Sequence, residues 1–304
     1  MNPQEQPTSS PGLFLVIEGS DGSGKGTQFK LLLERLKAEG YDVASYDFPQ
    51  YENGSSYFVR QYLNGNYGTA EELGAYTPSL FYALDRYSAA EKIRQDLQAG
   101  KVVLANRYVG SNMAHQGTKF NTIEERQTFF NWLDQLEFGM LQIPRADLNI
   151  VLLVPAQIAQ QLVDQKEKRS YTENKRDLHE ADLEHLERAV RVYEQLCQSY
   201  PNNFTAINCT DNNELHSIPN INNMIWERIE PMLKKLRKPE KKVKQSASEV
   251  FAPKKIENAY VVQNKNGSFS ITEAGKAFLS EAVTNTDKNV YAFTDKISSE
   301  TIAA

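Results

Sequence analysis

A glycine-rich turn between an apolar run and a helix-like stretch carries the clearest chemical signal in the sequence. The run Leu13-Phe-Leu-Val-Ile-Glu18 is followed by Gly19-Ser-Asp-Gly-Ser-Gly-Lys25. Glycines in such a turn adopt backbone angles closed to other residues, so successive N–H groups can converge on phosphate oxygens. Lys25 adds a positive charge, and the helix that begins beside it adds its unpaired N-terminal donors. The spacing therefore predicts a site for the phosphates of a nucleoside triphosphate.

One position departs from the usual phosphate-loop pattern. The pattern Gly-x-x-x-x-Gly-Lys-Ser/Thr places a magnesium-binding hydroxyl directly after the lysine, whereas Gly26 stands there and Thr27 follows. Because Mg²⁺ is often held largely through phosphates and water, this variant is compatible with binding. Thr27 is the predicted contact to Mg²⁺, through its hydroxyl or indirectly. The residues predicted to hold the triphosphate are Gly19, Gly22, Ser23, Gly24, Lys25, Gly26 and Thr27.

A second group of residues has the types expected around another phosphorylated ligand. Tyr82 and Arg86 stand four residues apart, so one helix face can present a ring for base stacking and a guanidinium for a phosphate. Asn106-Arg107-Tyr108 follows a predicted buried strand, where α/β proteins carry their working residues. The segment from Ser111 to Gly117 continues from it. Alone, the first pair more often means a tyrosine in the core and an arginine in a surface pair with Asp85, so its significance depends on the phosphate loop and on the position of Arg107.

A basic segment without helical or strand periodicity lies between two predicted helices, at about residues 166–178. Its basic residues are Lys166, Lys168, Arg169, Lys175 and Arg176. This character suits a lid that closes over phosphates; without a phosphate loop in the chain, a solvated loop would be the simpler interpretation. His179, Glu180 and His185 follow, but their spacing does not satisfy the zinc pattern H-E-x-x-H. We therefore expect both histidines on a helix surface.

Alternating strands and helices must position these residues. Apolar continuity predicts strands at 13–18, 41–48, 101–105, 148–154 and 204–208. Helical spacing and end signals predict helices at 25–39, 78–99, 123–141, 155–165, 180–198 and 218–236. The polar stretch 50–77 is too irregular for a simple connection, and such loops are usually functional. The order predicts an α/β fold: a five-stranded parallel sheet with helices on both faces, a lid, and the ligand at the carboxyl ends of the strands.

Composition limits the class of protein. Of 304 residues, 40% are hydrophobic and 24% charged, and no apolar run is long enough to span a membrane, so we expect a soluble globular protein. Cys197 and Cys209 are too few for a disulfide framework or a metal cluster, which fits a cytoplasmic location. The formal net charge of −5 argues against general binding of nucleic acid.

The two ends differ from the middle of the chain. Residues 1–11 are rich in Pro, Ser and Gln and lack the features of a secretion signal, so we expect a disordered lead-in to a phosphate-loop domain at 12–233. Residues 234–258 are lysine-rich and predict a solvated basic linker. The alternative, a nucleic-acid-binding patch, lacks interleaved aromatic residues. Residues 259–304 form a small extension, in which Asn266-Gly267 predicts a hairpin.

From Phe14 to about Met232 the chain resembles the thymidylate kinases of the phosphate-loop nucleoside monophosphate kinase family. The resemblance rests on the run Glu18 to Gln28, Phe48-Pro49, the Tyr82/Arg86 helix, Asn106-Arg107-Tyr108, Ser111 with Gln116-Gly117, and Arg176 to Glu180. It implies ATP-dependent phosphorylation of dTMP to dTDP with Mg²⁺, by a homodimer. Phosphoryl transfer of this kind needs mainly in-line positioning and positive charge around the moving group.

The resemblance also assigns roles to individual residues. Lys25 and the loop amides hold ATP, and a lid arginine reaches the transferred phosphoryl group. Arg169 is the preferred candidate for this arginine and Arg176 the second. The predicted catalytic residues are thus Lys25, Arg107, Arg169 and Arg176. The residues predicted to bind dTMP are Asp21 near the deoxyribose 3′-hydroxyl, Arg86 and Arg107 at the monophosphate, Tyr82 stacked on thymine, Ser111 and Gln116 at the nucleoside, and Phe48.

Asn106 departs from the resemblance, because the family usually has aspartate there. A carboxylate that would help to organise magnesium and water is therefore missing at this position. Two alternatives stay open: another nucleoside monophosphate kinase, against which Asp21 and the Ser111/Gln116 pair argue, and a nucleotide-binding switch with little turnover. Residues 290–304 faintly resemble the entrance to a flavin-dependent thymidylate synthase domain, which predicts a fusion beyond residue 304.

Overall fold

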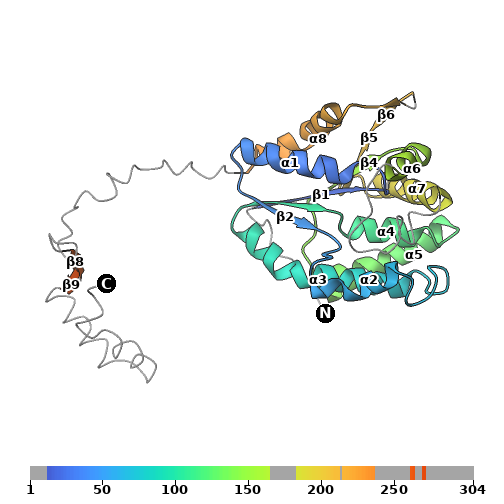
Figure 1. Ribbon diagram of the computed structural model, residues 1–304, viewed down its shortest axis with the longest axis horizontal. Helices are drawn as coiled ribbons and strands as arrows, with labels where there is room; N and C mark the ends of the chain where they lie inside the picture. The colour runs from blue at the N-terminus through green and yellow to red at the C-terminus, as the bar shows by residue number, and fades with distance from the viewer. Residues whose placement is uncertain (1–11, 165–182, 213, 237–260, 264–268, 272–304) are drawn as a thin grey trace, which may run out of the picture. The chain divides into compact units, whose positions relative to one another are not determined.

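The computed structural model describes residues 12–164, 183–212, 214–236, 261–263 and 269–271 (Figure 1). The chain divides into two compact units, 1–241 and 242–304. In the second unit, β8 (Val261–Gln263) pairs antiparallel with β9 (Phe269–Ile271), which are the arms of the predicted hairpin. The lead-in, the lid, the basic linker after residue 236 and the rest of the extension lie outside the described residues. Their boundaries stay predictions.

A five-stranded parallel sheet forms the centre of the first unit, as predicted. Its strands are β1 (Leu13–Gly19), β2 (Val43–Asp47), β3 (Val102–Asn106), β4 (Leu148–Leu153) and β5 (Phe204–Asn208), in the order β2-β3-β1-β4-β5. Leu13 pairs with Val102 on one side of β1, and Leu15 with Leu148 on the other. The strand order thus reverses beside β1, which places the phosphate loop at the crevice where parallel sheets bind ligands.

Helices cover both faces of this sheet (Figure 1). On one face, α1 (Lys25–Ala38), α6 (Ala156–Asp164) and α8 (Ile218–Leu233) contribute to a core with the odd-numbered residues of β1. On the other face, α3 (Tyr76–Gln98), α4 (Val109–Gly117), α5 (Ile123–Asp134) and α7 (Leu183–Ser199) pack on Phe14 and Val16. Because side chains alternate along a strand, the unbroken apolar run of β1 fills both cores.

Local signals set where α5 begins and how it ends. The Thr122 side chain accepts a hydrogen bond from the backbone N–H of Glu125, and the Glu125 carboxylate accepts one from the backbone of Thr122, which completes a capping box. The helix predicted over 123–141 is present, but it continues from Gln135 to Met140 as η2, a π-helical segment. A π-helical turn shifts the side chains that follow it, and Glu137 of η2 is fully buried.

The expectation of an irregular stretch at 50–77 was only partly right. It contains a short helix η1 (Gly54–Ser56) and the helix α2 (Tyr57–Leu63). The apolar side of α2 packs against α3, next to Phe81 and Tyr82. A small hairpin of β6 (Thr210–Asp211) and β7 (Glu214–Leu215) also escaped prediction. Among the residues that the structure describes, no helix is both long and apolar enough to cross a membrane.

Candidate active site

Two glycines give the phosphate loop its shape. Gly22 and Gly24 have φ angles of 78° and 81°, in the left-handed region that favours glycine. A Cβ atom on Gly22 would also lie 1.9 Å from the carbonyl oxygen of Ala159, so α6 could not approach as it does. Gly24 is the N-cap of α1, and Lys25 is the first residue of that helix. The loop therefore presents backbone donors at the helix N-terminus, the arrangement that binds phosphate.

The side chain of Lys25 contacts residues of the phosphate loop. Its Nζ donates to the carbonyl oxygen of Ser20 at 2.5 Å and lies 4.0 Å from Asp21 Oδ1. The side chain is buried, with 7% of its surface exposed. A buried ammonium in a site of this kind is positioned to pair with a phosphate group.

One cavity of about 300 Å³ brings most of the predicted site together. It is lined by ten of the predicted residues, namely Asp21, Gly24, Lys25, Gly26, Phe48, Tyr82, Arg86, Arg107, Ser111 and Gln116. Gly19, Gly22, Ser23 and Thr27 lie outside this lining, and Thr27 is exposed on the first turn of α1. Arg169 and Arg176 lie outside the described residues.

Arg107 joins the phosphate loop to helix α4. Its side chain donates to Ser111 Oγ at 3.0 Å and forms a close ion pair with Asp21. Its backbone has φ 64°, which is rare for a residue with a side chain, and its N–H donates to the carbonyl oxygen of Ile17 at 2.9 Å. Such strained residues persist where the surroundings over-determine them, as they do at many functional sites.

Glu18 supports the candidate site, and the sequence did not predict this role. This fully buried carboxylate accepts hydrogen bonds from the backbone of Tyr108 at 2.9 Å and of Ser111 at 3.0 Å. It also accepts from the hydroxyls of Ser111 at 2.5 Å and of Tyr193 at 3.1 Å. Burial and the charge of Glu18 raise the pKa of Tyr193 well above its ordinary value, so its hydroxyl stays a donor. Glu18 thus ties the end of β1 to α4 and α7.

Arg86 is paired with a residue that sequence spacing could not reveal. Its guanidinium forms a bidentate ion pair with Glu137 of η2, in which Nε lies 2.7 Å from Oε2. The alternative of a surface pair with Asp85 was wrong, because Asp85 accepts from the backbone of Gln50 at 2.8 Å and from Ser55 Oγ at 2.6 Å. Burial acts to lower the pKa of Arg86, but the Glu137 charge reverses this and raises it. Arg86 is therefore a fixed cation in the cavity wall.

The cavity lining also contains aromatic rings and an amide without hydrogen-bond partners. The rings of Tyr82 and Tyr62 meet edge to face, with centroids 6.3 Å apart, and Phe48 lies beside Tyr108 at 5.6 Å. Gln116 is fully buried, and neither its Oε1 nor its Nε2 has a hydrogen-bond partner among the described residues. Buried amides are nearly always satisfied in native proteins, so this one is suited to a ligand with complementary donor and acceptor groups.

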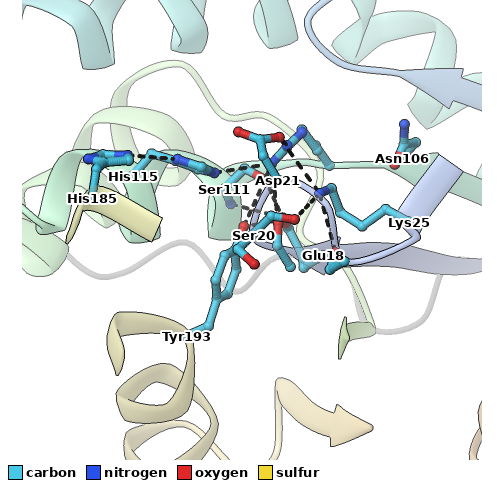
Figure 2. A network of polar contacts seen from close by, with 12 residues as sticks. Glu18, Ser20, Asp21, Lys25, Asn106, Ser111, His115, His185 and Tyr193 are labelled. Atoms are coloured by element: carbon cyan, nitrogen blue, oxygen red, sulfur yellow. Dashed lines mark hydrogen bonds and ion pairs between the residues drawn. The ribbon is translucent and has the colours of Figure 1, made fainter. Parts of the chain in front are cut away.

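His185 corrects the expectation that both histidines lie on a helix surface, whereas His179 is outside the described residues. His185 is buried and stacks against His115, with ring centroids 5.6 Å apart (Figure 2). Because arginine can only donate, His115 Nε2 accepts from Arg107 at 3.2 Å, so its proton is on Nδ1, 3.4 Å from His185 Nε2. The two histidines thus help to fix the position of the Arg107 side chain.

Asn106 and Asp47 face each other at the ends of adjacent strands. They are in register as the last residues of β3 and β2, and Asn106 Nδ2 donates to Asp47 Oδ1 at 2.9 Å. Both line the cavity. The Oδ1 atom of Asn106 is buried and has no hydrogen-bond partner among the described residues. The carboxylate that is absent at position 106 is thus present on the neighbouring strand, a pairing that depends on strand register and not on sequence spacing.

Sequence comparison adds a family to this geometry. Residues 17–217 match the profile of the thymidylate kinase family. A thymidylate kinase of Mycobacterium tuberculosis is 29% identical over 185 residues, which are 60% of this chain and 85% of the relative. One from Desulfotalea psychrophila is 30% identical over 208 residues, 67% of this chain and 92% of the relative.

Structure comparison supports the same fold. A thymidylate kinase structure from Candida albicans aligns with a TM-score of 0.55 over 73% of this chain and 92% of that one, at 19% identity. A likeness at this identity shows the fold alone. The match of the family profile, which covers about two thirds of the sequence and includes the phosphate loop from Glu18 onward, Arg86, Arg107 and Gln116, shows that the chain belongs to the thymidylate kinase family.

Proposed function

We propose that the chain transfers the γ-phosphoryl group of ATP to dTMP, giving ADP and dTDP. A phosphate oxygen of dTMP attacks the γ-phosphorus, and the bond from that phosphorus to the β,γ-bridging oxygen breaks. The observation that carries the proposal is the single cavity shared by Lys25 of the phosphate loop and the guanidinium groups of Arg86 and Arg107. Two phosphorylated ligands placed there would meet between fixed positive charges, which is what phosphoryl transfer requires.

The donor half consists of the loop and the start of α1. Backbone N–H groups from Gly22 to Gly26 and the ammonium of Lys25 hold the triphosphate in this proposal, and Thr27 adds a hydroxyl at the first turn of the helix. The lid arginines Arg169 and Arg176, which lie outside the described residues, would add charge at the transferred group. Lid closure would also exclude water and limit hydrolysis of ATP.

The acceptor half consists of α3, α4 and the residues after β3. Arg86 and Arg107 take the monophosphate in this proposal, and Asp21, which already binds Arg107, accepts from the deoxyribose hydroxyl. Tyr82 and Phe48 flank the base. The unsatisfied amide of Gln116 supports this assignment, because thymine carries alternating carbonyl oxygens and an N–H group.

The oxygen donors of the cavity fit magnesium. Mg²⁺ prefers oxygen ligands and keeps several waters when it binds with a nucleotide. In this proposal the phosphates and water supply most of the ligands of the ion, and the protein adds oxygen donors. When bound, the ion neutralises phosphate charge. Asn106 Oδ1 is a buried oxygen still lacking a partner.

The first experiment compares monophosphates as acceptors. With saturating MgATP, we expect ADP release to depend on dTMP, with kcat/KM about 10-fold or more above the values for AMP and CMP. Equal rates with AMP or CMP would favour another nucleoside monophosphate kinase. ADP release that no monophosphate stimulates would favour a nucleotide-binding switch. The variant Lys25→Met, which lacks the cation of the phosphate loop, is the negative control and should release little ADP.

A homodimer is proposed from family resemblance and from one face of α3. Its exposed apolar residues are Tyr76, Leu80, Leu84 and Tyr87, which are 42%, 40%, 47% and 51% exposed and recur at helical spacing. A contiguous apolar stripe of this kind marks a protein interface. We expect sedimentation velocity to give the dimer mass and Leu84→Glu to give the monomer mass. The control Ile218→Glu, on α8, should stay dimeric; a monomeric parent would refute the proposal.

A further inference from the structure

Asp47 is a carboxylate inside a cavity built for phosphates. It ends β2, and the cavity that it lines is also lined by Lys25 and Gly26 of the phosphate loop. Its side chain is exposed to the solvent of that cavity. Partial burial raises the pKa of Asp47, whereas the Asn106 amide and the charges of Arg107 and Lys25 act to lower it. The carboxylate therefore belongs to the electrostatic environment of the phosphate loop.

The other carboxylates of the cavity already have strong partners. Asp21 forms a close ion pair with Arg107, and Asp85 accepts from the backbone of Gln50 and from Ser55. Asp47 takes part in no ion pair within the described part of the chain, and its hydrogen bond from Asn106 engages Oδ1. No ion pair within the described residues therefore neutralises the charge of Asp47.

An anionic side chain beside bound phosphates needs a cation between them. Like charges in a partly desolvated site repel each other strongly, so Asp47 alone would oppose the binding of a triphosphate. Magnesium removes this conflict because it takes carboxylate oxygens as ligands together with substrate phosphates. The unsatisfied Asn106 Oδ1 is a second oxygen at the same place.

We propose that Asp47 holds the magnesium ion that accompanies ATP, either directly or through a water molecule bound to the ion, and that Asn106 orients the Asp47 carboxylate. This inference rests on the proposed function. The Asn106 amide fixes the carboxylate through Nδ2, in the way that hydrogen-bonded neighbours orient metal ligands. The carboxylate of this site is therefore supplied by Asp47 at the end of β2, and not by position 106 at the end of the neighbouring strand β3.

The variant Asp47→Asn keeps the size of the side chain and removes its charge. We expect apparent Mg²⁺ affinity, titrated at fixed ATP and dTMP, to fall about 10- to 100-fold. The affinity of Mn²⁺ for the complex of enzyme, a non-hydrolysable ATP analogue and dTMP should fall by the same factor. Electron paramagnetic resonance measures this affinity without any turnover. The control Asp42→Asn makes the same change at an exposed residue just before β2 and should alter neither value.

A charge-swap variant separates this role from a structural one. In Asp47→Asn/Asn106→Asp the carboxylate moves to the paired position on β3, and we expect Mn²⁺ affinity to return to within about threefold of the parent, since ligand and partner have exchanged places. Unchanged Mn²⁺ binding in a folded Asp47→Asn protein overturns the inference, as does failure of the swap to restore it. A parent enzyme without dTMP-stimulated turnover refutes the proposed function instead, and the Mn²⁺ measurement still tests Asp47.

Discussion

Replacing Arg107 by alanine is expected to lower kcat/KM for dTMP by about 10³-fold. Its guanidinium is the cation that joins the phosphate loop to α4, through Asp21 and Ser111. Preorganised donors aimed at a developing charge are worth factors of about 10² to 10³ each, and arginines at a transferred phosphoryl group are worth more. Steady-state kinetics with dTMP varied at saturating MgATP measure the effect, and thermal unfolding verifies the fold.

Two further variants give this result its meaning. Arg107→Lys keeps one charge but loses the bidentate fork, so we expect it to recover only part of the activity. Arg35→Ala removes a cation from α1 that lies over the Trp226 ring at 4.2 Å, away from the cavity, and should leave kcat/KM unchanged. A loss of less than about threefold in Arg107→Ala would exclude Arg107 from the site, since one such donor is worth far more.

Substituting Arg86 by methionine is expected to damage both the fold and the site. Glu137 is fully buried, and removing its partner leaves an uncompensated charge, which costs about 3–5 kcal/mol of stability. If Arg86 holds the monophosphate as proposed, that group also loses a cation, so we expect KM for dTMP to rise about 10²-fold. Urea denaturation and initial rates at several dTMP concentrations measure the two effects.

The double variant Arg86→Met/Glu137→Leu separates these effects. Replacing a whole buried ion pair by apolar side chains of similar volume is often neutral or stabilising, so the free energy of unfolding should return to near the parent value. The high KM for dTMP should remain. Recovery of the parent KM would show that Arg86 serves the fold only and would transfer the monophosphate contact to another residue.

The fold was predictable where one local signal sufficed. The apolar run of β1, the glycines at its end and the alternation of strands and helices gave the sheet and its helices, because burial on both faces demands such runs. The short helix α2 escaped because its stability comes from tertiary contacts. Arg60 donates to the carbonyl oxygens of Tyr51 at 2.6 Å and Asn53 at 3.1 Å, and Tyr62 is buried against α3. Neither interaction leaves a periodic trace in the sequence.

The residues of the candidate site could be proposed from the sequence, but their pairings could not. Lys25, Arg86 and Arg107 were predicted from local patterns, and the structure places all three in the lining of one cavity. Their partners come from distant segments: Glu137 lies 51 residues after Arg86, and His185 lies 70 residues after His115. Even Asp47, next to the predicted Phe48, gains its significance only from the register of β2 with β3. Contacts of this range are decided by packing, which one sequence does not display.

The fully satisfied carboxylate of Glu18 has a mechanical consequence. It joins the end of β1 to the first turn of α4 and to the middle of α7, so one side chain connects the strand that leads into the phosphate loop to the helix that carries Ser111 and Gln116. Separating them would strand a buried charge, which makes this joint stiff. Under the proposed function, this joint would keep the separation between the two substrate sites constant whether or not either substrate is bound.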